Sequence, residues 1–266
     1  MAGLAQILLA ALVVTVTPPK DAPGGKVDDD TTAFYAEYAI SYLGLPVGST
    51  TFRSSFKDDR FAMEGSMASA GLARIFDSTE ASVKVGGAIG GKQPRPESYL
   101  LAYTSGDKHK STRLVFKAGN VSKVENVPPL KKRGGSWVPV TRTHFSSVID
   151  PMSAALVAAP SLAAVCRRTI KVFDGELRAD LVLSEPSMTT VDSSAYSGEA
   201  VTCRARFVPV AGYRSDNRSI TYLRDRSAIS VTFAPLAKTG VYAPIRASVG
   251  TQIGPVSVDL RRLEAR

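Results

Sequence analysis

The stretch that decides the fold runs from Cys166 to Tyr213, with CRRTIKVFDGELRADLVL at 166–183 and YSGEAVTCRARFVPVAGY at 196–213. Asp174-Gly175 stands between two strand-like runs, and this dipeptide is the strongest short-range signal of a β-hairpin. On either side, apolar residues alternate with polar ones at Leu177, Ala179, Leu181 and Leu183, and again at Val201, Cys203, Ala205 and Phe207. A period of two predicts half-buried β-strands.

Composition limits the class of protein. The chain has 266 residues, of which 44% are hydrophobic and 21% charged, so it can form one large core or two modest ones and is not disordered as a whole. The net charge of +9 favours acidic partners such as nucleic acid, anionic lipid or anionic polysaccharide. The basic residues are scattered, however, and several occupy expected outward strand positions, which favours a solvated strand face: Arg178, Arg204, Arg206 and Arg261.

The N-terminus predicts export. Leu4 to Val16 is an uncharged apolar run of signal-peptide length, too short to span a bilayer, and a Pro/Gly-rich lead-in follows it. No Lys or Arg precedes the run and no clean small-x-small cleavage site follows; a misassigned start codon explains the first departure. We expect a signal-like segment and lead-in over 1–31, a single β-rich domain over 32–266, and no further transmembrane anchor.

The chain has two cysteines, Cys166 and Cys203, and in an exported protein we expect them to form a disulfide. Chain entropy gives such a bridge roughly 3 to 4 kcal/mol of stability. The alternative is a pair of buried, reduced thiols in a cytosolic core. A metal or redox role is disfavoured, because there is no Cys-x-x-Cys and the histidines, His109 and His144, are not spaced to complete a site.

The rest of the chain is also predicted to be mainly β. Further strands are expected over 34–43, 49–56, 61–69, 81–85, 99–103, 113–117, 121–127, 227–233, 242–249 and 256–260. Residues 71–77 fit a short helix or a bulged strand, and Gly86-Gly87 is expected to end a strand. One helix is predicted, with Asp150 as N-cap, Pro151 at the first position and Pro160 as the stop. The fold class is therefore all-β and mainly antiparallel, a curved sheet forming a half-barrel, a wrap or a two-layer sandwich.

Several short motifs resemble those of the bacterial exported proteins grouped as Domain of Unknown Function 3108, nearest to the alphaproteobacterial branch. They are the Gly-Leu-Pro-Val-Gly turn at 44–48, the Asp-Pro-Met-Ser-Ala run at 150–154, Val-Phe-Asp-Gly at 172–175, Tyr-Ser-Gly at 196–198 and Val-Pro-Val-Ala-Gly at 208–212. The resemblance covers about 33–262. It implies a periplasmic β protein of a Gram-negative bacterium, with a curved sheet like that of lipoprotein carriers and a role in envelope upkeep, and it supplies no catalytic residues.

No stretch carries a catalytic or cofactor signature. A Ser-His-Asp set can be written from Ser146 or Ser147, His144 and Asp150, but real triads assemble from distant positions, and no Gly-x-Ser-x-Gly elbow is present. The glycine-rich run at 86–92 does not match phosphate-loop spacing and fits a flexible loop between strands. The basic run at 131–133 fits a solvated loop tip. We therefore expect no enzyme activity, no cofactor or metal and no nucleic-acid partner.

Two classes of function remain. In the first, the curved sheet holds an apolar groove or cavity, closed by the segment that begins at Asp150, and binds a lipid-like or peptide ligand. In the second, the protein is a scaffold that contacts other envelope proteins through its surface. A continuous apolar concave surface or a cavity favours the first class. An exposed apolar patch favours the second, together with an interior filled by residues such as Leu181, Leu183, Phe207 and Val258. The sequence leaves the oligomeric state open.

Overall fold

The computed structural model describes residues 31–69, 79–91, 93–131 and 133–265, and one large antiparallel sheet of fourteen strands dominates them. The first half of the chain is a meander of β1 (Thr32–Tyr42), β2 (Leu45–Lys57), β3 (Arg60–Ser69), β4 (Thr79–Gly90), β5 (Gln93–Ser105), β6 (Lys108–Lys117) and β7 (Asn120–Val127). The second half supplies β10 (Arg168–Phe173), β11 (Arg178–Asp192), β12 (Ser197–Ala211), β14 (Ile229–Pro235), β15 (Val241–Thr251) and β16 (Gly254–Ala265). The all-β, mainly antiparallel fold class is confirmed.

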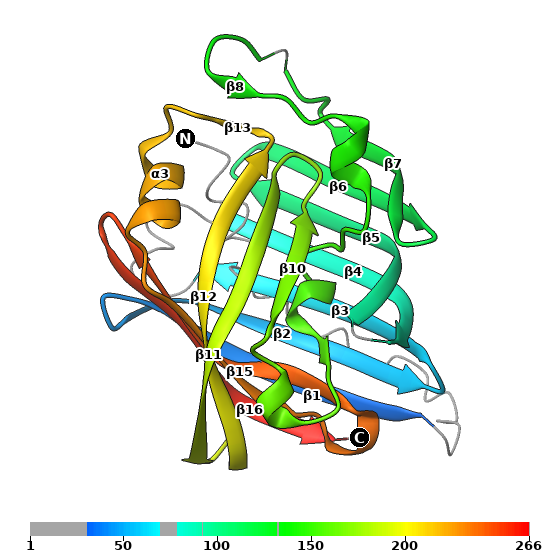
Figure 1. Cartoon of the computed structure of the whole chain (residues 1–266), viewed down its shortest axis with the longest axis vertical. Coiled ribbons are helices and arrows are strands. Elements are labelled where there is room, and N and C mark those ends of the chain that lie inside the picture. Colours follow the sequence, from blue (N-terminus) through cyan, green and yellow to red (C-terminus); the bar gives the residue numbers. More distant parts are fainter. Residues whose placement is uncertain (1–30, 70–78, 92, 132, 266) are drawn as a thin grey trace.

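Pairing of the last strand with the first joins the two halves. β16 lies antiparallel to β1, so the strand order is β10-β11-β12-β14-β15-β16-β1-β2-β3-β4-β5-β6-β7. The smaller elements are β8 (Trp137–Val138), which pairs with β13 (Tyr213–Arg214), β9 (Val157–Ala158), the helix α3 (Arg218–Asp225), and 3-10 turns η1 (Arg142–Phe145), η2 (Ser153–Ala155), η3 (Leu162–Ala164) and η4 (Ala237–Thr239). The sheet curls around its own apolar face without closing into a barrel (Figure 1).

The chain between β8 and β10 runs inside the curled sheet, and we call residues 145–165 the inner segment. Val148, Met152 and Leu156 of this segment are buried in one apolar cluster with side chains from both halves of the sheet. That cluster contains Phe34, Phe56, Phe61, Val83, Tyr99, Leu114, Val121, Phe173 and Val241. Each strand buries one face, and the inner segment gives those faces a partner without a second sheet.

The inner segment also occupies the gap between the two edges of the sheet. Ile149 forms a parallel bridge to β10, donating its N–H to the Lys171 carbonyl (2.9 Å) and accepting from the Phe173 N–H (2.9 Å). On the other side, the Ser147 N–H donates to Asn120 Oδ1 of β7 (3.1 Å). Two backbone groups of the β10 edge thereby gain partners within the same chain, which protects that edge from pairing with other molecules, while β7 is held through the side chain of Asn120.

A second contact between the edges lies at the Asp174-Gly175 turn. Asn126 of β7 donates from Nδ2 to the Gly175 carbonyl (3.1 Å) and accepts from the Thr112 hydroxyl (2.7 Å). Gly175 has a φ of +103°, and a Cβ atom there would lie 2.3 Å from Thr112 Cγ2. The turn that makes the hairpin therefore also requires glycine in order to dock against β6 and β7.

The helix predicted from Asp150 to Pro160 is wrong, because the 3-10 turn η2 begins only at Ser153, with Met152 at its N-cap position. The Asp150 side chain nevertheless accepts from the N–H groups of Met152 and Ser153, as a cap does. The chain makes only the short turn η2 and then extends into β9, which pairs with Val241 and Tyr242 of β15. β16 pairs only with residues 246–251 of β15, so the beginning of β15 has an open edge that β9 fills. Strand pairing therefore replaces the helix at this point, because it satisfies backbone groups that would otherwise be buried without partners.

Helix α3 was not predicted. Asn217 caps it, accepting from the N–H groups of Ser219 (3.0 Å) and Ile220 (3.2 Å). Ile220 and Leu223 are buried against Leu177, Ala179 and Phe207. The helix therefore covers the apolar residues at one end of the sheet.

The glycine-rich run is strand over 86–90 rather than loop, and the turn comes only at Gly91. β4 continues to Gly90 and pairs with β5 past a bulge at Gly86/Gly87. A Cβ atom on Gly87 would lie 2.3 Å from the Arg95 carbonyl oxygen, so glycine allows the two backbones to approach closely there. The ambiguous stretch 71–77 and the signal-like segment 1–30 lie outside the described residues.

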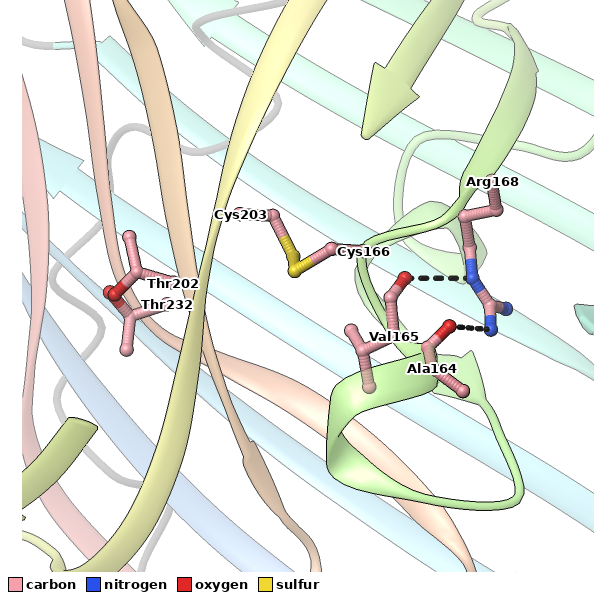
Figure 2. Close-up of a disulfide and its surroundings, with 7 residues drawn as sticks. All are labelled: Ala164, Val165, Cys166, Arg168, Thr202, Cys203 and Thr232. Carbon is pink, nitrogen blue, oxygen red and sulfur yellow. Dashed lines mark hydrogen bonds between the residues drawn. A yellow bond between two sulfur atoms is a disulfide. The ribbon is translucent and has the colours of Figure 1, made fainter. Parts of the chain in front are cut away.

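The predicted disulfide between Cys166 and Cys203 is present, and both residues are fully buried (Figure 2). It ties the end of the inner segment to β12. The hydroxyls of Thr202 and Thr232 lie on the other side of β12 and β14 (Figure 2), 2.9 Å apart. Next to the disulfide, the Arg168 guanidinium donates to the carbonyls of Val165 (2.9 Å) and Ala164 (3.2 Å) and so stabilises the turn before Cys166. The inner segment is thus fixed at both ends, by Ile149 and by Cys166.

Replacing both cysteines with alanine should lower the free energy of unfolding by roughly 3 to 4 kcal/mol, since the bridge closes a loop of 37 positions in the unfolded chain. Urea denaturation of the oxidised protein and of the Cys166→Ala/Cys203→Ala variant measures the difference. Reductant should reduce the stability of the first protein and leave the second unchanged. Equal stability of the two proteins would show that the bridge does not constrain the chain.

Asn126→Ala should lower the free energy of unfolding by about 1–3 kcal/mol, because it leaves the Gly175 carbonyl and the Thr112 hydroxyl without their partner. Ser122→Ala is the control. Ser122 is exposed on the same strand, and water can replace the bond from its hydroxyl to the Val115 carbonyl (3.0 Å), so stability should change by less than about 0.5 kcal/mol. If the two variants unfold at the same denaturant concentration, the contact between the sheet edges does not stabilise the fold.

Candidate functional site: an apolar cavity inside the curled sheet

An apolar cavity of about 240 Å³ lies between the sheet and the inner segment. Its walls come from the inner faces of β1, β2, β14, β15 and β16 and from η2. The space stays open because several of the side chains that line it are small: Ala36, Ala155, Ala234, Ala243 and Ala247. Larger apolar residues complete the wall, chiefly Phe34, Phe52, Met63, Met152, Leu156, Ile245, Leu260 and Leu263. The alternation in these strands predicts an apolar face, and the alanines turn part of that face into a cavity.

The hydroxyl groups in the wall do not make the cavity polar. Tyr38 donates its hydroxyl to the Pro244 carbonyl (2.8 Å), and Thr50 donates to the Ser66 carbonyl (2.9 Å). Burial raises the pKa of Tyr38 well above its ordinary value, so the phenol stays neutral. Arg246 is largely exposed, and its Nε atom is 2.7 Å from Asp259 Oδ1, so its charge is compensated at the rim. The described lining contains no carboxylate, imidazole or thiol.

Asp150 holds the inner segment against the cavity. Its side chain is fully buried, and Oδ1 accepts from the N–H groups of Met152 (2.9 Å) and Ser153 (2.9 Å), while Oδ2 accepts from the Ser153 hydroxyl (2.6 Å). These bonds to the N–H groups two and three residues further on are those of a helix cap, but the 3-10 turn begins only at Ser153, with Met152 at its N-cap position. Pro151 and Met152 are thereby presented to the cavity.

Burial dominates the electrostatics around Asp150. Desolvation raises the pKa of Asp150 to about 6, against the opposing effect of its hydrogen bonds to Ser153 and Met152. Burial also raises the pKa of Tyr99, and the negative charges of Asp150 and Asp174 add to this shift. The Tyr99 hydroxyl has no hydrogen-bond partner within the described part of the chain. None of these three groups lines the cavity.

The residues considered for catalysis are not brought together. His144 accepts at Nδ1 from the Thr141 N–H (3.0 Å), whereas the Asp150 carboxylate is bound by Met152 and Ser153. Ser146 and Ser147 are exposed. His109 contacts the hydroxyl of Thr104 in the β5–β6 hairpin. The structure therefore uses Asp150 as a cap and places its carboxylate away from the imidazole.

Other expectations have mixed outcomes. Leu183 and Phe207 are buried, Leu181 is half-buried, and Val258 lines the cavity. Arg204, Arg206 and Arg261 are exposed as expected. The expectation that Arg178 faces solvent is wrong, because the residue is only 5% exposed. Its Nη1 atom lies 2.6 Å from Asp180 Oδ1, since residues two apart on a strand share a face.

The basic loop tip is only partly solvated. Arg133 pairs with Glu176 (2.5 Å) and lies over the Trp137 ring at 4.9 Å from its centroid. Over the described ranges, no group of three or more His, Cys, Asp or Glu side chains could hold a metal ion. In the same part of the chain, no helix has the length and apolar character needed to cross a membrane.

The fold and the cavity define a class of protein: an antiparallel sheet curled around a crossing segment, with an apolar space between them. The family model described as "Protein of unknown function (DUF3108)" matches residues 37–261, so the chain belongs to that family, as its motifs suggested. No curated protein matches. A solved structure, "Crystal Structure of Beta-barrel-like Protein of Domain of Unknown Function DUF1849 from Brucella abortus", is similar over 90% of this chain and 99% of that chain, with 7% identity and a TM-score of 0.48.

The raised pKa of Asp150 predicts how stability depends on pH. The folded protein holds this proton up to about pH 6, whereas the unfolded chain releases it near 3.8, so stability falls as the pH rises through this window and is constant above it. One pKa unit corresponds to about 1.4 kcal/mol, which makes the loss roughly 3 kcal/mol. Asp174, also raised to about 6 by burial, adds a change of the same sign.

Asp150→Asn isolates this effect, because the amide oxygen can still accept from Met152 and Ser153. The difference in unfolding free energy between the protein and this variant should change by roughly 3 kcal/mol between about pH 3 and about pH 7, as measured by urea denaturation. A difference that is the same at every pH would mean that Asp150 titrates normally in the folded protein.

Proposed function

We propose that this protein is a non-enzymatic, exported protein of the periplasm that binds an apolar or lipid-like ligand in the cavity of the curled sheet and serves the upkeep of the cell envelope. The observation that carries the proposal is the cavity itself, about 240 Å³ between η2 and the strands β1, β2 and β14 to β16. Natural ligand sites typically span about 300–1,000 Å³, and an engineered cavity of about 150 Å³ already holds benzene. The space is therefore suited to part of a hydrocarbon chain.

The chemistry of the wall supports an apolar ligand over a polar one. The hydroxyls of Tyr38 and Thr50 are directed to backbone carbonyls, so they offer little to a polar guest. Water is poorly held in a space with few polar partners, and an acyl chain would replace it favourably. The same space disfavours the scaffold alternative, which expected a filled interior.

The disulfide supports export. Bridges such as Cys166–Cys203 form and persist in oxidising compartments, among them the bacterial periplasm, and are rare in the cytosol. Lipids that move between the two membranes of the envelope must cross the aqueous periplasm. A periplasmic protein that binds hydrocarbon could carry them. We propose this binding role over an enzymatic one because the described wall of the cavity is built mainly from apolar side chains.

The experiment is native mass spectrometry with lipid extraction on protein isolated from its own periplasm, followed by titration with the fluorescent fatty acid cis-parinaric acid. We expect co-purified lipid and saturable binding of the probe. Ala155→Phe should weaken binding by roughly tenfold or more, since the ring would fill the space beside Met152. Ala163→Phe is the matched control, because it adds the same ring to the exposed side of η3 and should bind as the unaltered protein does.

Thermal unfolding of both variants shows whether the fold survives. A protein that carries no lipid and does not bind the probe contradicts the proposal. So does equal binding by folded Ala155→Phe and Ala163→Phe, because the ligand would then lie elsewhere.

A further inference from the structure

Two neighbouring hairpin turns expose large apolar side chains at one end of the molecule, and we call Leu43, Leu45 and Ile253 the apolar tip. Their exposed fractions are 56%, 64% and 75%. The Leu43 N–H donates to the Pro255 carbonyl (3.0 Å), and the Tyr42 hydroxyl donates to the Ile253 carbonyl, so the β1–β2 and β15–β16 turns lie side by side. In Figure 1 the two turns project together beside α3.

Local folding preferences do not explain leucine at position 43. Leu43 has a φ of +51° and Gly44 a φ of +79°, a turn in which Asn or Asp is favoured at the first position. The other described two-residue turns of the meander carry small or polar residues: Asp58-Asp59, Gly106-Asp107 and Ala118-Gly119. One side of Leu43 packs on Gly254, where a Cβ atom would lie 2.4 Å from Leu43 Cδ2, but more than half of the side chain stays exposed. Backbone in the left-handed region at a non-glycine residue clusters at functional sites.

A basic surface adjoins the apolar tip. Gln252, next to Ile253, donates from Nε2 to the Arg218 carbonyl at the start of α3 (3.1 Å) and accepts from the Ser219 hydroxyl (3.4 Å). Arg218 and Arg226 are exposed at the two ends of α3, and the charge of Arg226 also acts on the neighbouring Asp225. The first turn of α3 has no acidic residue, and an arginine there opposes the helix dipole. The positive charge of Arg218 at the helix N-terminus is therefore locally unfavourable, as is leucine at the left-handed position 43.

We propose that the apolar tip and the arginines of α3 together form a docking surface for an anionic lipid bilayer. Leu43, Leu45 and Ile253 would enter the boundary of the acyl chains, while the guanidinium groups of Arg218 and Arg226 bind lipid phosphates at headgroup level. The net charge of +9 strengthens attraction to such a surface. The surface is separate from the cavity and stands whether or not the cavity holds a ligand.

The test is co-sedimentation of the full protein with vesicles of phosphatidylglycerol and phosphatidylcholine. The protein should bind these vesicles, bind pure phosphatidylcholine weakly, and be released by high salt. Leu43→Asn/Ile253→Ser should weaken binding roughly tenfold or more, and the asparagine suits the turn, so the fold is kept. Arg218→Gln and Arg226→Gln should each weaken it about fivefold.

Met188→Ser is the matched control, because Met188 on β11 is 52% exposed and lies outside the tip. It should leave vesicle binding unchanged, and so should the cavity variant Ala155→Phe, which separates this surface from the proposed ligand site. The proposal is overturned if the protein does not bind the anionic vesicles, or if Met188→Ser loses as much binding as the tip variant. It is also overturned if the tip variant instead turns a dimer into a monomer in light scattering.

Discussion

The pairing of Ile149 with β10 is the interaction on which the rest of the structure depends. A curled sheet that does not close leaves two edges with unpaired N–H and C=O groups, and here these edges are β7 and β10. Ile149 satisfies β10 through Lys171 and Phe173, and the neighbouring Ser147 reaches Asn120 of β7. Once the chain occupies this gap, its continuation must pass through the interior.

The cavity follows from that passage. The crossing chain is narrower than a second sheet, so it covers the apolar faces of β4, β5 and β6 with Val148, Met152 and Leu156 but cannot fill the whole interior. Asp150 fixes its direction by accepting from the N–H groups of Met152 and Ser153, and the Cys166–Cys203 bridge fixes its exit. Where alanines such as Ala155 and Ala247 face one another across the remaining space, the space stays open. An unfilled interior costs stability, and its retention favours a binding role.

Local signals in the sequence predicted most of the sheet. Alternation and turn residues such as Asp174-Gly175 act between neighbours in the chain, so strands and hairpins could be identified from them. The helix after Asp150 could not be judged in this way, because the open edge of β15 that draws in β9 lies about 80 residues further along the chain. Helix α3 is only eight residues long, and Asn217 followed by Ile220 and Leu223 was the signal available.

The apolar face of the cavity could likewise be expected from alternation, and a cavity was one of two alternatives. Its position could not, because it depends on which alanines of distant strands meet around η2. The burial of Arg178 has a similar cause: the sequence places it on one face of a strand with Asp180 but does not show whether that face is covered.

Amide hydrogen exchange followed by NMR tests the central claim most directly, that the inner segment is an integral part of the sheet and walls the cavity. If the claim is right, the amides of Ile149, Phe173 and Leu156 exchange only on global unfolding, at the rate of the buried strand residue Tyr99. If these three amides exchange as fast as the amide of exposed Ala118 in the β6–β7 turn, the segment opens independently of the sheet, and the claim that it walls the apolar cavity is contradicted.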